Sequence, residues 1–309
     1  MDFIKDIELV AIDALDNWKI DHSEALDWDR IVLLYFNKKL MFIDNTPRDV
    51  KVSRKIKSST YKPDITKALA VIEDKFRKGE DVNPHSTRRL YKSKFTDNLF
   101  ADWNIRHLHL STGPHPKDER LLDGTSDLLF LRVTNDTAYF IDVRPHGTFE
   151  QIDLLEMAVD EWPGLYLWIP DATRVGRQIG TTGEIVEIKI ETPEEIRDLR
   201  ENRINVLYMI KGKVYVAPGG GIIPAGTLVN ATRLHNALFY WRIDLEKCVN
   251  DNRPKIDEYL SQFQNYKPEE ASFRVGMNEG EFVFFEETSW VGLSKFEGKE
   301  NARFVWESL

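Results

Sequence analysis

Apolar residues at helical spacing dominate the first eighty residues of the chain. Between residues 2 and 18 they recur every three or four positions, and aspartates occupy the opposite side, which is the pattern of an amphipathic helix. A second helix is predicted around residues 30–43, with Asp27 or Asp29 as its N-cap. A third is predicted from Asp64 to Gly79, because glycine commonly ends helices.

Two intervening segments carry weaker patterns. Residues 51–56, KVSRKI, are a short basic candidate for extended structure. Residues 81–103 place leucine and phenylalanine on a ragged apolar face, and Ser86 precedes that face as a plausible N-cap. We therefore expect a further helix in this second segment.

The period of the pattern changes from helical to alternating at Ile105. Residues 105–111 alternate in the manner of a strand, and two more strands are predicted over 127–134 and 137–144. The turn-forming Asn135 and Asp136 between the last two favour a hairpin. Helical spacing returns over residues 149–162, so the local order is three strands followed by a helix.

The remaining half of the chain repeats this mixture of elements. We expect a fold of the α+β class, with a helical N-terminal part, a small central antiparallel sheet with flanking helices, and a C-terminal α+β part. The corresponding boundaries are 1–80, 81–192 and 193–309. The predicted elements of this half are strands at 166–170 and 184–191, a helix at 193–203, a strand pair around Lys211 and Gly212, helices at 228–252 and 254–266, and strands within 273–294.

Composition narrows the class of protein. With 309 residues and 42% apolar content the chain can bury a sizeable core, and its single cysteine, Cys248, excludes an internal disulfide. The first twenty residues do not have the pattern of a secretory signal, and no stretch of eighteen consecutive apolar residues suggests a membrane span. We expect a cytoplasmic protein that does not enter a membrane.

Charge is distributed unevenly along the chain. The net charge is -9, yet residues 51–94 contain thirteen lysines and arginines against five acidic residues. Such a segment is often one solvated helical face, but it can also follow a phosphate backbone. It directly precedes the most unusual part of the sequence.

Four of the seven histidines fall between residues 102 and 149: His107, His109, His115 and His146. Imidazole titrates near neutrality and can act as acid, base, phosphate partner or metal ligand. Strand alternation places His107 and His109 on one face and sends Arg106 to the other. His146 follows the end of a strand, and Asp142 could orient a histidine by accepting a ring N–H.

The region allows several alternative functional interpretations. A metal site would need His146 or Asp142 as a third ligand. The tetrads beginning at His109 and His146 have the H-x-[ST]-x form of 2H phosphoesterases. A PD-(D/E)xK nuclease reading would use Asp127 with Asp142 and Arg144, where lysine is expected, or Glu187 with Lys189. The glycines at 219–221 lack a phosphate-loop motif.

The block from Thr87 to Phe149 resembles the core of RelE/HigB-type toxins. The resemblance runs through residues 106–110, 128–133 and 139–143, and through His146. It implies a ribonuclease that needs no metal and activates the ribose 2′-hydroxyl. It further implies that His107, His109 and His146 share proton transfer and phosphate contact, and that basic side chains bind RNA: Arg88, Arg89, Lys92, Lys94 and Arg106. The whole chain also resembles a bacterial protein family with the motifs DWxIxHLHL, LLF and YFIDVxxHG.

We therefore predict an RNA-cleaving nuclease of a bacterial toxin or phage-defence type, with His107, His109, His146 and Asp142 as its catalytic residues. No cofactor or metal is assigned, and an antitoxin or another protein is a candidate partner. The alternatives are a regulatory protein that binds nucleic acid or protein without catalysis, and a metal-dependent or 2H-type phosphoesterase. Convergence of the histidines decides between catalysis and binding.

Overall fold

The structure is a computed structural model, and it describes residues 2–169, 177–179, 185–187, 192–205, 207–299 and 302. The fold is of the α+β class, as predicted. The chain divides into two units: residues 39–229 form one, and residues 1–38 with 230–309 form the other. The predicted boundaries at 80/81 and 192/193 do not coincide with the limits of either unit.

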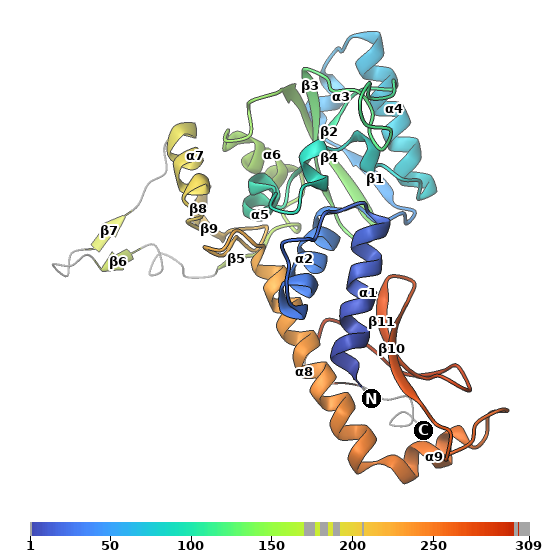
Figure 1. The fold of residues 1–309 in the computed structure, drawn as a ribbon. Helices are drawn as coiled ribbons and strands as arrows, with labels where there is room; N and C mark the ends of the chain where they lie inside the picture. The colour runs from blue at the N-terminus through green and yellow to red at the C-terminus, as the bar shows by residue number, and fades with distance from the viewer. Residues whose placement is uncertain are drawn as a thin grey trace. The chain divides into compact units, whose positions relative to one another are not determined.

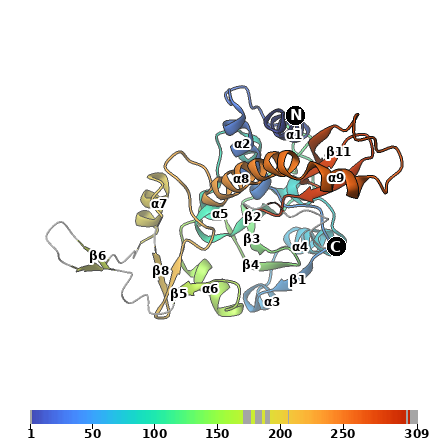
Figure 2. The ribbon, with the colours of Figure 1, turned by 90° about the horizontal axis from the view of Figure 1, so that it is seen from below.

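A four-stranded sheet of order β1-β4-β3-β2 organises the unit of residues 39–229. Antiparallel pairing joins β2 (Arg106–His109) to β3 (Asp127–Val133) and β3 to β4 (Thr137–Pro145), which was the arrangement expected for the three alternating segments. The strand β1 (Asp49–Val52) adds to β4 in parallel. Figures 1 and 2 show these strands side by side.

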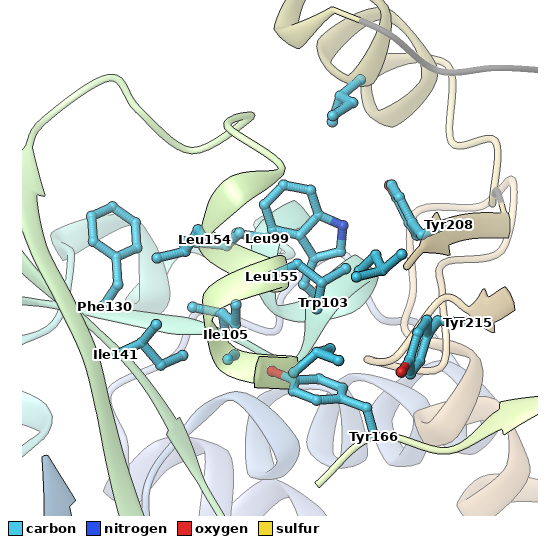
Figure 3. Close-up of a cluster of buried hydrophobic side chains, with 14 of the residues drawn as sticks. Leu99, Trp103, Ile105, Phe130, Ile141, Leu154, Leu155, Tyr166, Tyr208 and Tyr215 are labelled. Carbon is cyan, nitrogen blue, oxygen red and sulfur yellow. The ribbon is translucent and has the colours of Figure 1, made fainter. Parts of the chain in front are cut away.

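Both faces of this sheet are covered. Leu108, Leu129 and Phe140 pack on one face against α4 (Pro63–Lys78), which ends at Gly79 as predicted. Phe130 and Ile141 belong to the core that includes α5 (Asn98–Trp103) and α6 (Asp153–Glu161) (Figure 3). Burial on both faces fixes the strand register, because a shift by one residue would exchange the two sets of side chains.

Two local predictions in this unit were wrong. The segment 51–56 is not extended throughout: Ser53 accepts a hydrogen bond from the Ile56 amide and begins α3 (Arg54–Ser58). The segment 81–103 is not one helix, and Ser86 is not its N-cap. It consists of two 3-10 turns, η1 (Asn83–His85) and η2 (Arg88–Tyr91), followed by α5. The side chains of Thr87 and Asp97 cap η2 and α5, respectively, and each starts a new short element.

The rest of this unit adds short elements to the core behind α6. The helix α7 (Pro193–Glu201) begins with a capping box between Thr192 and Glu195. It contributes Ile196 to the core, and the neighbouring sheet contributes Tyr208 and Tyr215. That sheet has the order β5-β9-β8, and a separate pair joins β6 to β7. Their bounds are β5 (Trp168–Ile169), β6 (Arg177–Ile179), β7 (Ile185–Glu187), β8 (Leu207–Ile210) and β9 (Lys213–Val216).

The second unit combines helices from both ends of the chain with an antiparallel sheet of order β10-β11-β12. Phe3 of the first helix packs edge-on against Phe284 of the sheet, at 5.6 Å between ring centroids. Arg274 in turn donates to both carboxylate oxygens of the buried Asp6. The elements are α1 (Phe3–Asn17), α2 (Trp28–Met41), α8 (Val229–Asp251), α9 (Arg253–Leu260), β10 (Phe273–Asn278), β11 (Glu281–Glu286) and β12 (Val291–Lys295).

A buried carboxylate closes the end of β11. Glu286 accepts hydrogen bonds from the backbone and hydroxyl groups of Thr288 and Ser289 and from the amide of Ser272. Burial acts to raise the pKa of Glu286, but the bonds donated to the carboxylate outweigh burial and hold the pKa below its ordinary value. The ionised form of Glu286 therefore stabilises the folded state.

We predict that Glu286→Gln lowers the free energy of unfolding by about 2 kcal/mol at pH 7, because an amide nitrogen cannot accept the bonds that one carboxylate oxygen receives. A depressed folded-state pKa means that the stabilisation is present above the unfolded pKa of about 4.3 and is lost as pH falls. Urea unfolding from pH 7 to pH 3 should show the variant and wild type converging. The change Glu287→Gln, at a neighbouring half-exposed carboxylate that accepts only the Ser272 hydroxyl at hydrogen-bond distance among the described residues, should cost far less, and an equal cost would contradict this account.

Candidate functional site

Two histidines meet at one end of the four-stranded sheet, on either side of β3. The backbone amide of Thr125 donates to Nδ1 of His109 at 3.0 Å. The next residue, Ser126, accepts a hydrogen bond from the backbone N–H of His146 at 2.6 Å through its carbonyl. Since Thr125 and Ser126 directly precede β3, they hold the end of β2 and the residue that follows β4 at the same place.

The ring of Phe149 links His107 to His146. The ring of Phe149 lies 5.0 Å from the His107 ring and 5.1 Å from the His146 ring, between centroids, and both contacts are edge-on. The centroids of the two imidazoles are therefore no further apart than the sum of these distances. His107, His109 and His146, which were predicted from the sequence to share a site, are brought together.

His109 is a neutral hydrogen-bond donor at neutral pH. Burial, together with the charges of His107 and His146, lowers the pKa of His109 to about 4. Because Nδ1 accepts the Thr125 amide, the proton of the neutral ring must reside on Nε2. Nε2–H of His109 can therefore donate to a ligand oxygen without an added positive charge.

His107 is the more buried of the paired histidines on β2. Burial lowers its pKa; the carboxylate of Asp97 opposes that shift and the charge of His146 adds to it. Nδ1 of His107 lies 3.6 Å from Asp97 Oδ2 and makes no hydrogen bond within the part of the chain that the structure describes. This geometry suits a neutral ring that shapes the site, whereas His146 is exposed to solvent.

One further histidine supports the site and was missed from the sequence. His85 is fully buried, and its Nδ1–H donates to the backbone carbonyl of His109 at 3.0 Å. Burial lowers the pKa of His85. It lies 22 positions before His107, outside the dense stretch, so no spacing rule identified it. His115, which belongs to that stretch, instead accepts the amide of Lys117 in a loop.

Two residues predicted for the site are occupied elsewhere. Asp142 aligns with Phe130 and His107 across the sheet, but its carboxylate accepts from Nε of Arg144 at 2.7 Å rather than from a histidine. Arg106 donates to the carbonyls of Leu40 and Met41 and stacks on Phe100. Burial lowers the pKa of Arg106 to about 10. The alternation that separated Arg106 from the histidines thus explains its structural role.

The basic segment 51–94 does not form one continuous track. Its first part lies at the β1 edge of the sheet and its middle part lies on α4, where Arg77 and Lys78 pair with acidic neighbours on their own helix. The last part includes η2, whose Leu90 lines the same small cavity as His107. The side chains of Arg88, Arg89, Lys92 and Lys94 are exposed there.

A small cavity joins the segment 86–97 to the edge strand β2. It has a volume of about 30 Å³, and its polar lining includes Ser86, Thr87, Asp97, Arg106 and His107. That volume suits one or two water molecules rather than a nucleotide.

The described residues contain no arrangement of side chains that supports the alternative interpretations of the site. Among the described residues, no group of three or more histidine, cysteine, aspartate or glutamate side chains is placed to hold a metal ion. Asp127 accepts from the hydroxyl of Ser126, and Arg144 is held by Asp142 and Asp153. The Glu187 and Lys189 pair extends into residues outside the described ranges. Cys248 is buried in α8.

Comparison with known proteins adds no further assignment. No family model, curated protein or solved structure matches this chain. The RelE/HigB resemblance therefore stays a prediction. In the part of the chain that the structure describes, no helix combines the length and apolarity needed to cross a membrane.

We predict that the free energy of unfolding rises with pH between about 4 and 6.5. Unfolded His109 binds a proton over this range and folded His109 does not, so the stability is complete above pH 6.5 and is lost as pH falls. His109→Asn, which keeps an acceptor for the Thr125 amide, should reduce this slope by at most about 1.4 kcal/mol per pH unit. Urea unfolding across the range measures it, and His115→Asn serves as the control. An unchanged slope in His109→Asn would show that His109 is not held neutral.

Proposed function

We propose that the unit of residues 39–229 cleaves RNA without a metal ion, at the site formed by His109 and His146. The observation that carries this proposal is the convergence of the two imidazoles across the start of β3, in different environments. His109 is a neutral donor, and His146 is exposed. Paired groups with different tasks are the requirement of acid–base catalysis at a phosphodiester.

In this proposal His146 accepts the proton of the ribose 2′-hydroxyl. The 2′-oxygen then forms a bond to phosphorus, the bond from phosphorus to the 5′-oxygen breaks, and the departing oxygen takes a proton from water. Nε2–H of His109 donates to a non-bridging phosphate oxygen, where negative charge grows in the transition state. The products are a 2′,3′-cyclic phosphate and a 5′-hydroxyl end.

Substrate binding in this proposal uses the exposed cations of residues 88–94. Arginine and lysine contact phosphates without reading the base sequence. Arg88 and Arg89 belong to η2, which contributes Leu90 to the cavity wall that also contains His107. A strand of RNA bound along this segment would approach the histidines from the β2 edge.

We predict that purified protein cuts single-stranded RNA in the presence of EDTA and leaves 2′,3′-cyclic phosphate ends. His146→Ala and His109→Ala should each lower the rate by about 100-fold or more, the usual effect of removing a group that moves or donates a proton in the transition state. Gel analysis of labelled RNA with end-group mapping measures both the rate and the product.

The matched control for this assay is His115→Ala, which removes a histidine of the same stretch that lies in a loop and bonds only locally. Its rate should equal that of wild type. Cleavage abolished by EDTA would favour a metal centre over this mechanism. RNA binding without cleavage would replace the catalytic proposal by the regulatory binding protein.

We further predict that Arg88→Ala with Lys92→Ala weakens RNA binding at every sequence tested. Each lost phosphate contact should reduce the slope of log affinity against log salt by about 0.7 for a single strand. Fluorescence anisotropy at several salt concentrations provides the measurement. Lys51→Ala, at the opposite edge of the sheet, should leave both affinity and slope unchanged, and an equal loss in that variant would argue against a binding surface at residues 88–94.

A further inference from the structure

A buried polar network lies behind the histidine site. Asp102 of α5 and Arg200 of α7 are 8% and 7% exposed, and Arg200 Nε donates to Asp102 Oδ2 at 2.9 Å. The hydroxyl of Tyr208, on β8, donates to the same oxygen. The guanidinium of Arg200 also lies over the ring of Trp103, 4.2 Å from its centroid. The network thereby joins α5 to α7 and β8, whose contacting residues lie 98 and 106 positions further along the chain.

This network continues to the histidine site through one hydrogen bond. Nη1 of Arg200 donates to the backbone carbonyl of Phe149 at 2.7 Å. The Phe149 ring is the group that contacts both His107 and His146, and it packs, partly buried, against the core cluster that contains Trp103 and Tyr208. Arg200 therefore fixes the backbone from which this ring projects.

Phe149 lies in the turn between β4 and α6, and its ring also packs against Phe130, at 5.8 Å between centroids. It follows Gly147, which has a left-handed backbone with φ of +95°, and precedes the first turn of α6. Nearby, Thr148 bonds to the Pro145 carbonyl within the same turn. The bond from Arg200 ties this turn to a residue 51 positions away.

From these contacts we infer that Arg200 is a positioning residue for the histidine site: it holds Phe149 against His107 and His146 through the Phe149 carbonyl, while Asp102 holds Arg200. The inference rests on the proposed function only where it concerns catalysis. Its structural part concerns the environment of two imidazoles and can be measured without a substrate. Arginine suits this role because two nitrogens of its planar guanidinium donate to Asp102 and to Phe149 at the same time. The single ammonium group of lysine cannot reproduce that geometry.

The test compares Arg200→Lys with Tyr208→Phe by NMR titration of the histidine rings in the full chain. Arg200→Lys should release Phe149, hydrate His107 and raise the His107 pKa by about 1 unit, since burial is the main cause of its depression. Tyr208→Phe removes a bond to Asp102 but none to Phe149, so it should leave that titration unchanged. The charged groups that act on His107, Asp97 and His146, are the same in both variants.

A second variant tests the same inference in case Arg200→Lys does not fold. The double change Asp102→Asn with Arg200→Gln removes both charges, so it leaves no unpaired buried ion. It too should raise the His107 pKa. An unchanged His107 titration in folded protein of both designs would overturn the inference, and so would an equal shift in Tyr208→Phe.

RNA cleavage by the same variants separates this inference from the proposed function. If both hold, kcat/KM falls about tenfold or more in Arg200→Lys, because small displacements of reacting groups are costly. If the His107 pKa shifts in Arg200→Lys but the wild-type protein cuts no RNA, Arg200 positions the histidines and the ribonuclease proposal fails. If wild type cuts RNA and Arg200→Lys changes neither rate nor titration, the positioning role fails alone.

Discussion

Burial of the four-stranded sheet on both faces is the constraint on which the histidine site depends. Leu108 and Leu129 must face α4 while Phe130 faces α6, so β2 has only one acceptable register against β3. That register sends His107 and His109 to the α6 face and sets His109 opposite Leu128 at the end of the sheet. The backbone of Thr125 and Ser126 can then bond to His109 and His146 together.

Much of this local architecture could be predicted from sequence because local chemistry determines it. Alternation and the Asn135–Asp136 turn specify β3 and β4, and Gly79 ends α4 with a left-handed backbone, φ +72°. The segment 81–103 was mispredicted as one helix because its apolar residues form a ragged helical face. The N-caps Thr87 and Asp97 instead start two separate short elements within it. The parallel pairing of β1 with β4 was not predicted, since it depends on residues 88 positions apart.

The same holds for the site: local sequence predicted the direction of its side chains, whereas their partners depend on segments distant in the sequence. Strand alternation correctly separated Arg106 from His107, because the period of a strand is a property of its backbone. The partners of Asp142 and His107 could not be assigned in this way. Asp142 was expected beside a histidine, yet Arg144, two residues further on the same face, is nearer and better suited to a carboxylate. His85 reaches His109 only because η1 folds back on β2.

Burying the grouped imidazoles is unfavourable for the fold, so their grouping points to a function rather than to stability. Burial makes protonation of His107 and His109 unfavourable, and Nδ1 of His107 and Nε2 of His85 are buried without a hydrogen-bond partner among the described residues. Such nitrogens lose their hydrogen bonds to water and gain none from the protein. Apolar side chains at these positions would instead extend the neighbouring cores. Polar groups kept where apolar ones would be more stable are typical of sites that bind or react. In the proposed ribonuclease mechanism, the exposed ring of His146 beside them is the group that reaches a substrate phosphate, while the buried ring of His109 stays neutral.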